Sequence, residues 1–125
     1  MGVSYKIEKD VVVVTNSGSF SNRDVEKTLL ALTKDEGYRS GVQILFIDKG
    51  SEYNPPKHGA EKAALILGSL VPRISNKMAV VVKKDVHFGI ARMIQVYCES
   101  YGVTFQVFRE EQAARIWLGE DPNVK

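Results

Sequence analysis

The first two apolar segments of the chain predict a β-hairpin. Residues 3–8 read VSYKIE, where apolar and polar side chains alternate, and residues 11–15 read VVVVT. Alternation is typical of a strand with one solvated face, whereas an unbroken β-branched run is typical of a strand buried on both faces. Lys9 and Asp10 separate the two segments by the length of a two-residue turn. We therefore expect an antiparallel pair at the start of the chain.

A first helix is expected to follow the loop at residues 16–20. Ser21 precedes Asp24 in a capping pattern, and Leu29 and Leu32 recur at helical spacing. Gly37, within the segment DEGY, supplies the usual signal for the end of a helix. These residues predict a helix that begins after Ser21 and stops near Gly37.

The rest of the chain continues to alternate strand and helix. Strands are expected at residues 42–48, 77–84 and 103–108, and helices at 57–70, after Asp85 and at 109–118. This order, β-β-α-β-α-β-α-β-α, predicts one α/β domain over residues 1–125 with a mixed five-stranded sheet, in which an antiparallel edge strand precedes four parallel strands joined by right-handed crossovers. Residues 120–125 read as a frayed tail.

The apolar strands raise the question of what covers the second face of this sheet. The runs VVVV, ILFI and AVVV are apolar at consecutive positions, so both faces should be dry. Successive right-handed crossovers tend to lie on one side, which leaves the other side to be covered. Either a second copy of the chain or the first or last helix of the same chain can do this. We favour a homodimer, the commonest oligomer.

Composition and charge remove several functional classes. The net charge is +2, and basic residues are interleaved with acidic ones, so we expect no nucleic-acid partner. A single cysteine excludes an internal disulfide and fits a reducing compartment. The charged start MGVSYKIEKD does not resemble a signal peptide, and no apolar run approaches the roughly 18 residues needed to span a bilayer. A cytoplasmic protein of bacterial type is the expectation.

Three segments carry a resemblance to a known family. They read GYRSGVQILFID, RISNKMAVVVKKDVHFGIARM and FQVFREEQAARIWL, and with the hairpin they cover nearly the whole chain. Their order resembles the STAS domain, and more narrowly the small stand-alone SpoIIAA-like proteins of STAS/CRAL-TRIO-type fold. The STAS side of the resemblance implies a regulatory module that docks onto a protein partner. The CRAL-TRIO side implies a binder of a small apolar or anionic, lipid-like ligand.

One segment departs from the family pattern. In anti-sigma-factor antagonists the third strand ends in Asp, and a D-S-x-G-type turn then presents a serine for phosphorylation. Here Asp48 ends the strand, but residues 54–59 read NPPKHG where that turn should fall, and Ser51 lies too early. The resemblance therefore implies a module without the phosphoserine switch.

The segment DVHFGIARM, residues 85–93, supplies the main binding hypothesis. The candidate ligand-binding residues are Asp48, Lys83, Asp85, His87 and Arg92. They are expected near the carboxyl ends of central parallel strands, where open α/β sheets collect ligands. Backbone N–H groups of the helix start and nearby basic side chains would form an anion pocket there.

A purely structural interpretation of the same segment stays open. Arg92 then lies in solvent, Phe88 anchors the core and Gly89 permits close packing of helix on strand. If instead His87 and Arg92 are exposed binding residues, replacing both with Ala should change stability by no more than about 0.5 kcal/mol.

Catalytic and metal-binding patterns are weak. Cys98 and His87 are eleven residues apart on one expected helix, which is about 16 Å, so they cannot pair. One cysteine and two histidines make a closed zinc site improbable. Phosphate-binding glycine motifs and the G-x-S-x-G motif are absent from the sequence. We therefore expect a non-enzymatic protein without cofactor or metal, with protein–protein interaction favoured over ligand binding.

Overall fold

The structure, a computed structural model, describes residues 2–120 of the chain, so most of the predicted tail lies outside the described residues. The elements are β1 (Val3–Ile7), β2 (Val11–Asn16), α1 (Asn22–Thr33), β3 (Gln43–Asp48), α2 (Gly59–Leu70), β4 (Lys77–Val81), α3 (Asp85–Glu99), β5 (Thr104–Phe108) and α4 (Glu111–Trp117). Among these residues, none of the helices combines the length and the apolar character that crossing a bilayer requires.

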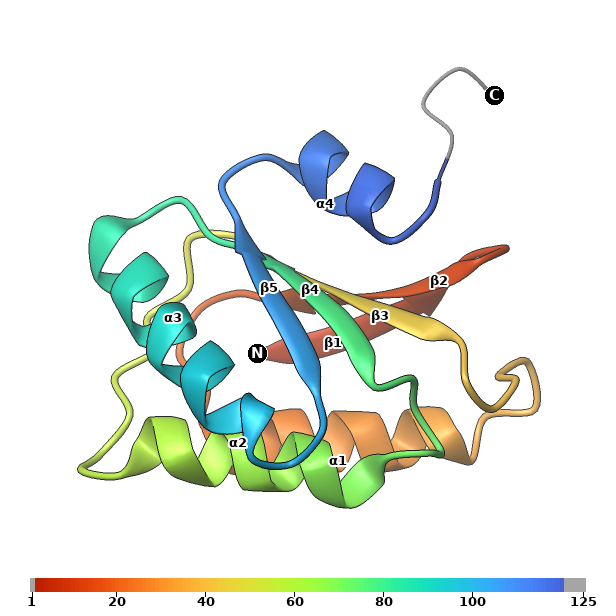
Figure 1. Cartoon of the computed structure of the whole chain (residues 1–125), viewed down its shortest axis with the longest axis horizontal. Helices are drawn as coiled ribbons and strands as arrows, with labels where there is room; N and C mark the ends of the chain where they lie inside the picture. Colours follow the sequence, from red (N-terminus) through yellow and green to blue (C-terminus); the bar gives the residue numbers. More distant parts are fainter. Residues whose placement is uncertain (1, 121–125) are drawn as a thin grey trace.

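The strands form a single mixed sheet in the order β1-β2-β3-β4-β5 (Figure 1). The hairpin pairs β1 antiparallel to β2 around the predicted turn, with Val3 opposite Asn16 and Ile7 opposite Val12. Every later pair is parallel. The predicted fold class, element order and strand directions are therefore confirmed.

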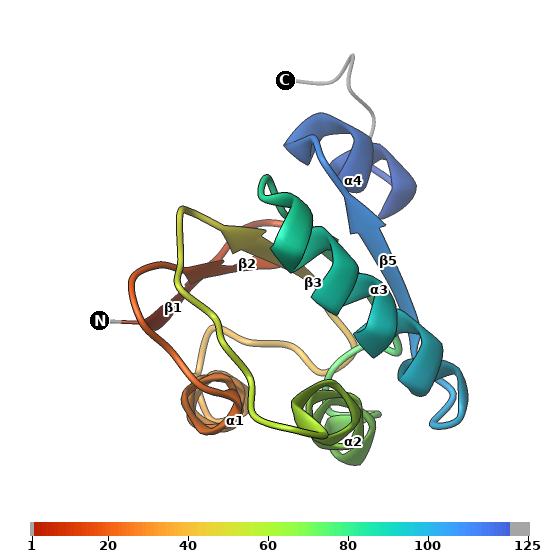
Figure 2. The same ribbon diagram turned by 90° about the vertical axis from the view of Figure 1, so that its left-hand side faces the viewer.

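Helices α1, α2 and α3 cover one face of the sheet, which we call the three-helix face (Figures 1 and 2). This arrangement follows from the right-handed crossovers, which put successive connections on the same side. The predicted cap of α1 is present, since the side chains of Ser21 and Asp24 each bond the other residue's backbone N–H. Leu29 and Leu32 of α1 are fully buried in the core of this face.

The opposite face of the sheet is covered by α4, and we call it the α4 face (Figure 1). Its apolar strand residues are Val11, Val13, Leu45, Ile47, Ala79 and Val81. Ala114 and Leu118 at the end of the chain pack against them. The last helix thus buries this face within one chain, which removes the reason for expecting a second copy. Dimerisation itself remains a prediction.

Two element boundaries differ from the sequence-based expectation. Helix α1 ends at Thr33 rather than near Gly37, because the side chain of Asp35 accepts a hydrogen bond from the Gly37 N–H at 2.8 Å and forms a turn. Helix α2 begins at Gly59, two residues later than predicted, because His58 adopts a left-handed conformation with φ of 65°. Neither change alters the topology.

Candidate functional site

Asp48 and His87 meet at the carboxyl ends of two neighbouring strands. Asp48 is the last residue of β3, and His87 lies in the first turn of α3, directly after β4. Oδ2 of Asp48 is 2.7 Å from Nδ1 of His87. The two side chains are only 8% and 7% exposed. A carboxylate and an imidazole are thus paired inside the molecule, at the edge of the sheet where ligands of open α/β folds bind.

The second oxygen of Asp48 is held by Ser51. Oδ1 accepts hydrogen bonds from the Ser51 N–H at 2.9 Å and from the Ser51 hydroxyl at 2.5 Å. Ser51 is fully buried, and its carbonyl accepts a hydrogen bond from Nζ of Lys84 at 3.3 Å. The hydroxyl therefore serves the carboxylate and is not directed at the imidazole, as a serine nucleophile would be. Its burial also keeps it from a protein kinase while the fold is intact.

The pairing fixes how His87 is presented. When the carboxylate of Asp48 is ionised it can only accept, and Nδ1 of His87 is then the donor of this hydrogen bond. Nε2 is then the polar atom that the ring can offer to a ligand. His87 is also one of the residues that line a cavity.

The cavity lies between the three-helix face of the sheet and its helices. It has a volume of about 90 Å³ and is lined mainly by apolar side chains. These include Phe46, Leu67, Val80, Ala91, Ile94 and Phe105. Polar side chains gather where the strands end, and they are Asn16, Asp48, Ser51 and His87. The cavity is thus apolar under the sheet and polar at the carboxyl edge.

Asn16 contributes an unpaired acceptor to this polar end. It is the last residue of β2, lies opposite Asp48 in the parallel register and is 8% exposed. Its Oδ1 is buried without a hydrogen-bond partner among the described residues. Such a group lowers stability by about 1–3 kcal/mol unless something donates to it. Asn16 also lines the cavity, so a rotation of its amide would present this oxygen to a ligand or water there.

Two aromatic rings lie at the mouth of the cavity. Phe20 and Tyr53 are stacked, with centroids 4.8 Å apart and planes within 10°. The Tyr53 hydroxyl donates to Oδ1 of Asn22, and Nδ2 of Asn22 donates to the Gly59 carbonyl at 2.9 Å. Burial raises the pKa of Tyr53 to about 12, although its hydrogen bond with Asn22 acts in the opposite direction. These contacts tie the two loops at the mouth to the starts of α1 and α2.

The mouth leads to a wider outer groove. This groove has a volume of about 550 Å³ and shares Phe20, Asn22, Tyr53 and Ile66 with the cavity. Its remaining lining is largely polar and includes charged side chains of both signs, namely Arg23, Glu26 and Lys62. A molecule whose apolar end enters the cavity can therefore continue into a polar environment.

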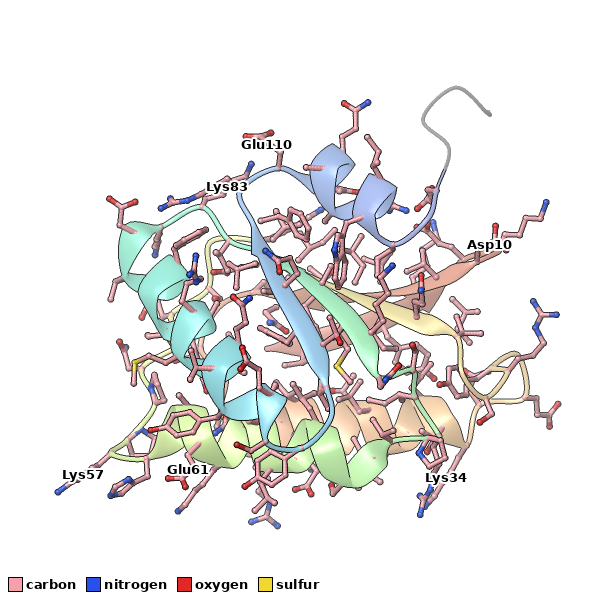
Figure 3. All side chains as sticks on the ribbon, viewed as in Figure 1. Asp10, Lys34, Lys57, Glu61, Lys83 and Glu110 are labelled. Carbon is pink, nitrogen blue, oxygen red and sulfur yellow. The ribbon has the colours of Figure 1, made fainter. Side chains whose placement is uncertain are left out.

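The other predicted site residues lie elsewhere. Lys83 donates to the Arg109 carbonyl at 2.7 Å and pairs with Glu110 at 3.6 Å on the outer surface, where both residues are labelled in Figure 3. Asp85 pairs with Arg109 at 2.9 Å and is 95% exposed. Arg92 is exposed on α3. The structure brings Asp48 and His87 together but not the remaining three, so the predicted anion pocket is not assembled.

The environment of α3 corrects three further expectations. His87 is buried, so it is not an exposed residue whose removal leaves stability unchanged. Asp85 is the first helical residue rather than the cap, a position that Lys84 occupies. Gly89 is exposed, and apart from its chain neighbours and the backbone of its own helix no atom lies within 4 Å of the position a Cβ would take there, so it does not permit close packing. Cys98 is fully buried, and burial raises the pKa of its thiol to about 12.

Some site residues had a signal in the sequence and others had none. His87 lies four residues before Ala91 and thus continues the buried stripe of Ala91, Ile94 and Cys98, so its burial was predictable. Asn16, at the polar end of an apolar strand, was a weaker signal. The stacking of Phe20 on Tyr53 had none, because it depends on how two distant loops meet. Among the described residues, no group of three or more His, Cys, Asp or Glu is placed to hold a metal ion.

Comparison with known proteins supports the fold. No family model matches the sequence, and no curated protein does either. Among solved structures, the chain is similar to an uncharacterized protein of the DUF3478 family with a SpoIIAA-like fold, from Shewanella loihica PV-4. The two share 18% sequence identity, and the match covers 94% of each chain with a TM-score of 0.60. The SpoIIAA-like fold that the sequence resembles is therefore confirmed.

Proposed function

We propose that this protein binds a small ligand, or the apolar end of a larger one, in the cavity beneath the three-helix face. The observation that carries the proposal is the combination of an apolar cavity with an unpaired, buried Oδ1 of Asn16 at its polar end. Ligand sites are mostly apolar and contain a few polar groups that fix orientation. The position at the carboxyl edge of the sheet supports the same assignment.

The size of the cavity limits what it can enclose. Pockets for drug-sized ligands have about 300–1,000 Å³, and a cavity of about 150 Å³ accommodates benzene. The volume of about 90 Å³ therefore suits a segment of a few non-hydrogen atoms. A longer ligand would place its remaining part in the outer groove. The CRAL-TRIO side of the sequence resemblance favours such a ligand.

We further propose that the protein binds without catalysing a reaction. Both oxygens of Asp48 are already bonded, one to Ser51 and one to His87. Ser51 is bonded to a carboxylate, and Cys98, which does not line the cavity, is buried with a raised pKa. A role as a carrier or sensor of its ligand fits this arrangement.

Native mass spectrometry of freshly purified protein tests the binding proposal. The wild-type chain should carry a reproducible extra mass above 13.9 kDa. Ala91→Leu fills the cavity and should lose that mass, whereas Ala113→Leu on the exposed side of α4 should keep it. A wild-type chain that shows only its own mass would contradict the proposal.

A second candidate function is docking onto a protein partner, as the STAS side of the resemblance implies. The observation in its favour is a row of exposed apolar side chains on α3, where Val86, Met93 and Val96 are 63%, 53% and 63% exposed. Their spacing places them along one side of the helix. Leu65 of the neighbouring α2 is also exposed, at 52%.

The docking candidate is tested by cross-linking in native lysate. The double variant Met93→Glu/Val96→Lys should abolish a cross-linked complex that wild-type protein forms. Ile116→Glu, on the exposed side of α4, is the matched control and should leave the complex intact. An unchanged complex in the double variant would remove the α3 surface from consideration.

A further inference from the structure

The polar end of the cavity is lined by one acidic and one basic side chain that are paired with each other. They are Asp48 and His87, whose Oδ2 and Nδ1 atoms are 2.7 Å apart. The ammonium group of Lys84 bonds the carbonyl of Ser51, and Lys84 does not line the cavity. The cavity therefore offers a ligand no basic side chain that lacks an acidic partner.

An anionic group would be destabilised at this position. It would have to leave water and lie close to the carboxylate of Asp48 in surroundings that screen charge weakly. His87 could not compensate, because it is already paired with Asp48 at 2.7 Å. A carboxylate is also purely an acceptor, so it cannot donate to the unpaired Oδ1 of Asn16.

A hydroxyl group fits the same polar end. It can both donate and accept, so it suits the Asn16 amide whether Oδ1 or Nδ2 is turned toward the cavity. His87 also lines this end of the cavity, and its ring nitrogen that is not bonded to Asp48 remains available for a hydrogen bond. A hydroxyl carries no charge to desolvate, so its transfer into the cavity is far less unfavourable than that of a carboxylate or an ammonium group.

The strand positions give the orientation of the ligand. Asn16 and Asp48 are the last residues of β2 and β3 and are paired in register. Phe46 lies two residues back along β3, and its ring is near that of Phe105, with centroids 6.4 Å apart. The apolar part of the cavity thus extends from the carboxyl edge back beneath the sheet.

We infer that the cavity selects a neutral ligand whose inserted part is a short aliphatic segment bearing a hydroxyl group. The hydroxyl lies at Asn16 and His87, and the aliphatic part lies against Phe46 and Phe105. This inference rests on the proposed binding function and specifies its ligand class. It excludes the anionic cargo that the sequence left open.

The test is an NMR titration at pH 7 with four matched probes, namely butan-1-ol, butyrate, butylammonium and 1-fluorobutane. Butan-1-ol should bind at least ten-fold more tightly than butyrate or butylammonium, and it should shift the signals of the Asn16 side-chain amide and of Ala91. Asn16→Leu should weaken butan-1-ol binding about ten-fold and leave 1-fluorobutane binding equal or stronger. Asn76→Leu, an exposed control at the other end of the sheet, should behave as wild type.

The outcomes separate the inference from the proposed function. Tighter binding of butyrate or butylammonium to the wild-type cavity would overturn the inference but leave ligand binding standing. If the Asn16→Leu variant prefers butan-1-ol over the other probes as strongly as the wild-type protein does, the role of Asn16 is overturned and the inference with it. If no probe shifts the cavity signals of the wild-type protein, the binding function fails as well. The ranking of probes on wild-type protein needs no variant, so it decides the matter even if Asn16→Leu does not fold.

Discussion

Both faces of the sheet bury apolar strand residues, but the two faces are completed in different ways. On the three-helix face, α1, α2 and α3 enclose a cavity of about 90 Å³ with polar groups at one end. On the α4 face, one short helix packs Ala114 and Leu118 directly onto the strands. The first face therefore has both the space and the polar atoms that a ligand requires, whereas the second serves to close the fold.

The polar side chains at the two faces also differ in their hydrogen-bond and ion-pair partners. Arg115 of α4 bonds Glu8 at 3.1 Å, Glu111 at 2.8 Å and Glu120 at 2.7 Å, and these acidic partners raise its pKa despite partial burial. The bond to Glu8 fastens α4 to the hairpin, whereas Glu111 and Glu120 lie in α4 or directly after it. On the three-helix face, Asn16 keeps an acceptor without a partner. The ion pair with Glu8 fastens α4 to the hairpin, whereas on the three-helix face a buried acceptor lacks a partner, which supports the proposed binding site.

The largest expected effect comes from breaking the buried pair of the three-helix face. Asp48→Ala should lower the free energy of unfolding by about 3–5 kcal/mol, because it leaves His87 and Ser51 buried without their partner. Asp85→Ala removes an exposed carboxylate that pairs with Arg109, and it should change stability by no more than about 0.5 kcal/mol. Urea denaturation of both variants measures the difference. Equal effects would mean that the Asp48–His87 pair is not buried as described.

The next largest effect concerns the α4 face. Leu118→Ala should lower the free energy of unfolding by about 2–4 kcal/mol, since Leu118 is 7% exposed and packs onto the strands. Ile116→Ala on the outer side of α4, 47% exposed, should have a much smaller effect. Sedimentation velocity of the wild type and Leu118→Ala should accompany the denaturation curves. A wild-type dimer that dissociates in Leu118→Ala would show that a second copy, and not α4 alone, completes this face.

Adding volume should distinguish the two faces directly. Ala79→Leu puts extra carbon atoms between β4 and α4, where packing is tight, and should lower stability by about 1–3 kcal/mol. Ala91→Leu places the same atoms in the cavity and should leave stability unchanged or raise it by up to about 1 kcal/mol. Urea denaturation checks both. If Ala91→Leu is as destabilising as Ala79→Leu, the cavity is not available space.

Parts of the fold that depend on residues close together in the sequence could be predicted from it, and parts that depend on distant residues could not. The hairpin, the capped start of α1 and the parallel strands follow from local patterns in segments such as residues 11–15. The placement of three helices on one face of the sheet follows from the right-handed crossovers. Which element covers the other face does not, because α4 reaches it only after the last strand, and nothing local in its seven residues specifies that docking.

The site was predictable in part for the same reason. Asp48 and His87 were each identified from their places at strand ends, but their pairing depends on the register of β3 on β4 and on the rotation of α3 about its axis. The grouping with Lys83 failed because the chain after β4 turns that side chain outward to Glu110. The pairing of Asp48 with His87 and the outward direction of Lys83 both depend on tertiary geometry, which the positions of single residues in the sequence do not specify.

The smallest expected effect is a decrease in the stability of the fold at alkaline pH. Burial raises the pKa of Cys98 from 9.0 to about 12. The unfolded chain therefore releases the thiol proton more readily than the folded chain does. Its contribution to stability is complete below pH 9 and is lost as the pH rises toward 12, at about 1.4 kcal/mol per pH unit. Cys98→Ala should therefore reduce the slope of stability against pH between pH 9 and 10. An unchanged slope would show that the thiol is not protected.

The account is tested most directly by methyl NMR spectra recorded under xenon pressure. Xenon enters small apolar cavities, so methyl signals of Leu67 and Ile94 should shift in a saturable way. Those of Val13 and Leu118 on the α4 face should not, and Ala91→Leu should abolish the shifts. Shifts absent from Leu67 and Ile94, or spread equally over both faces, would contradict the claim that the three-helix face holds the binding cavity.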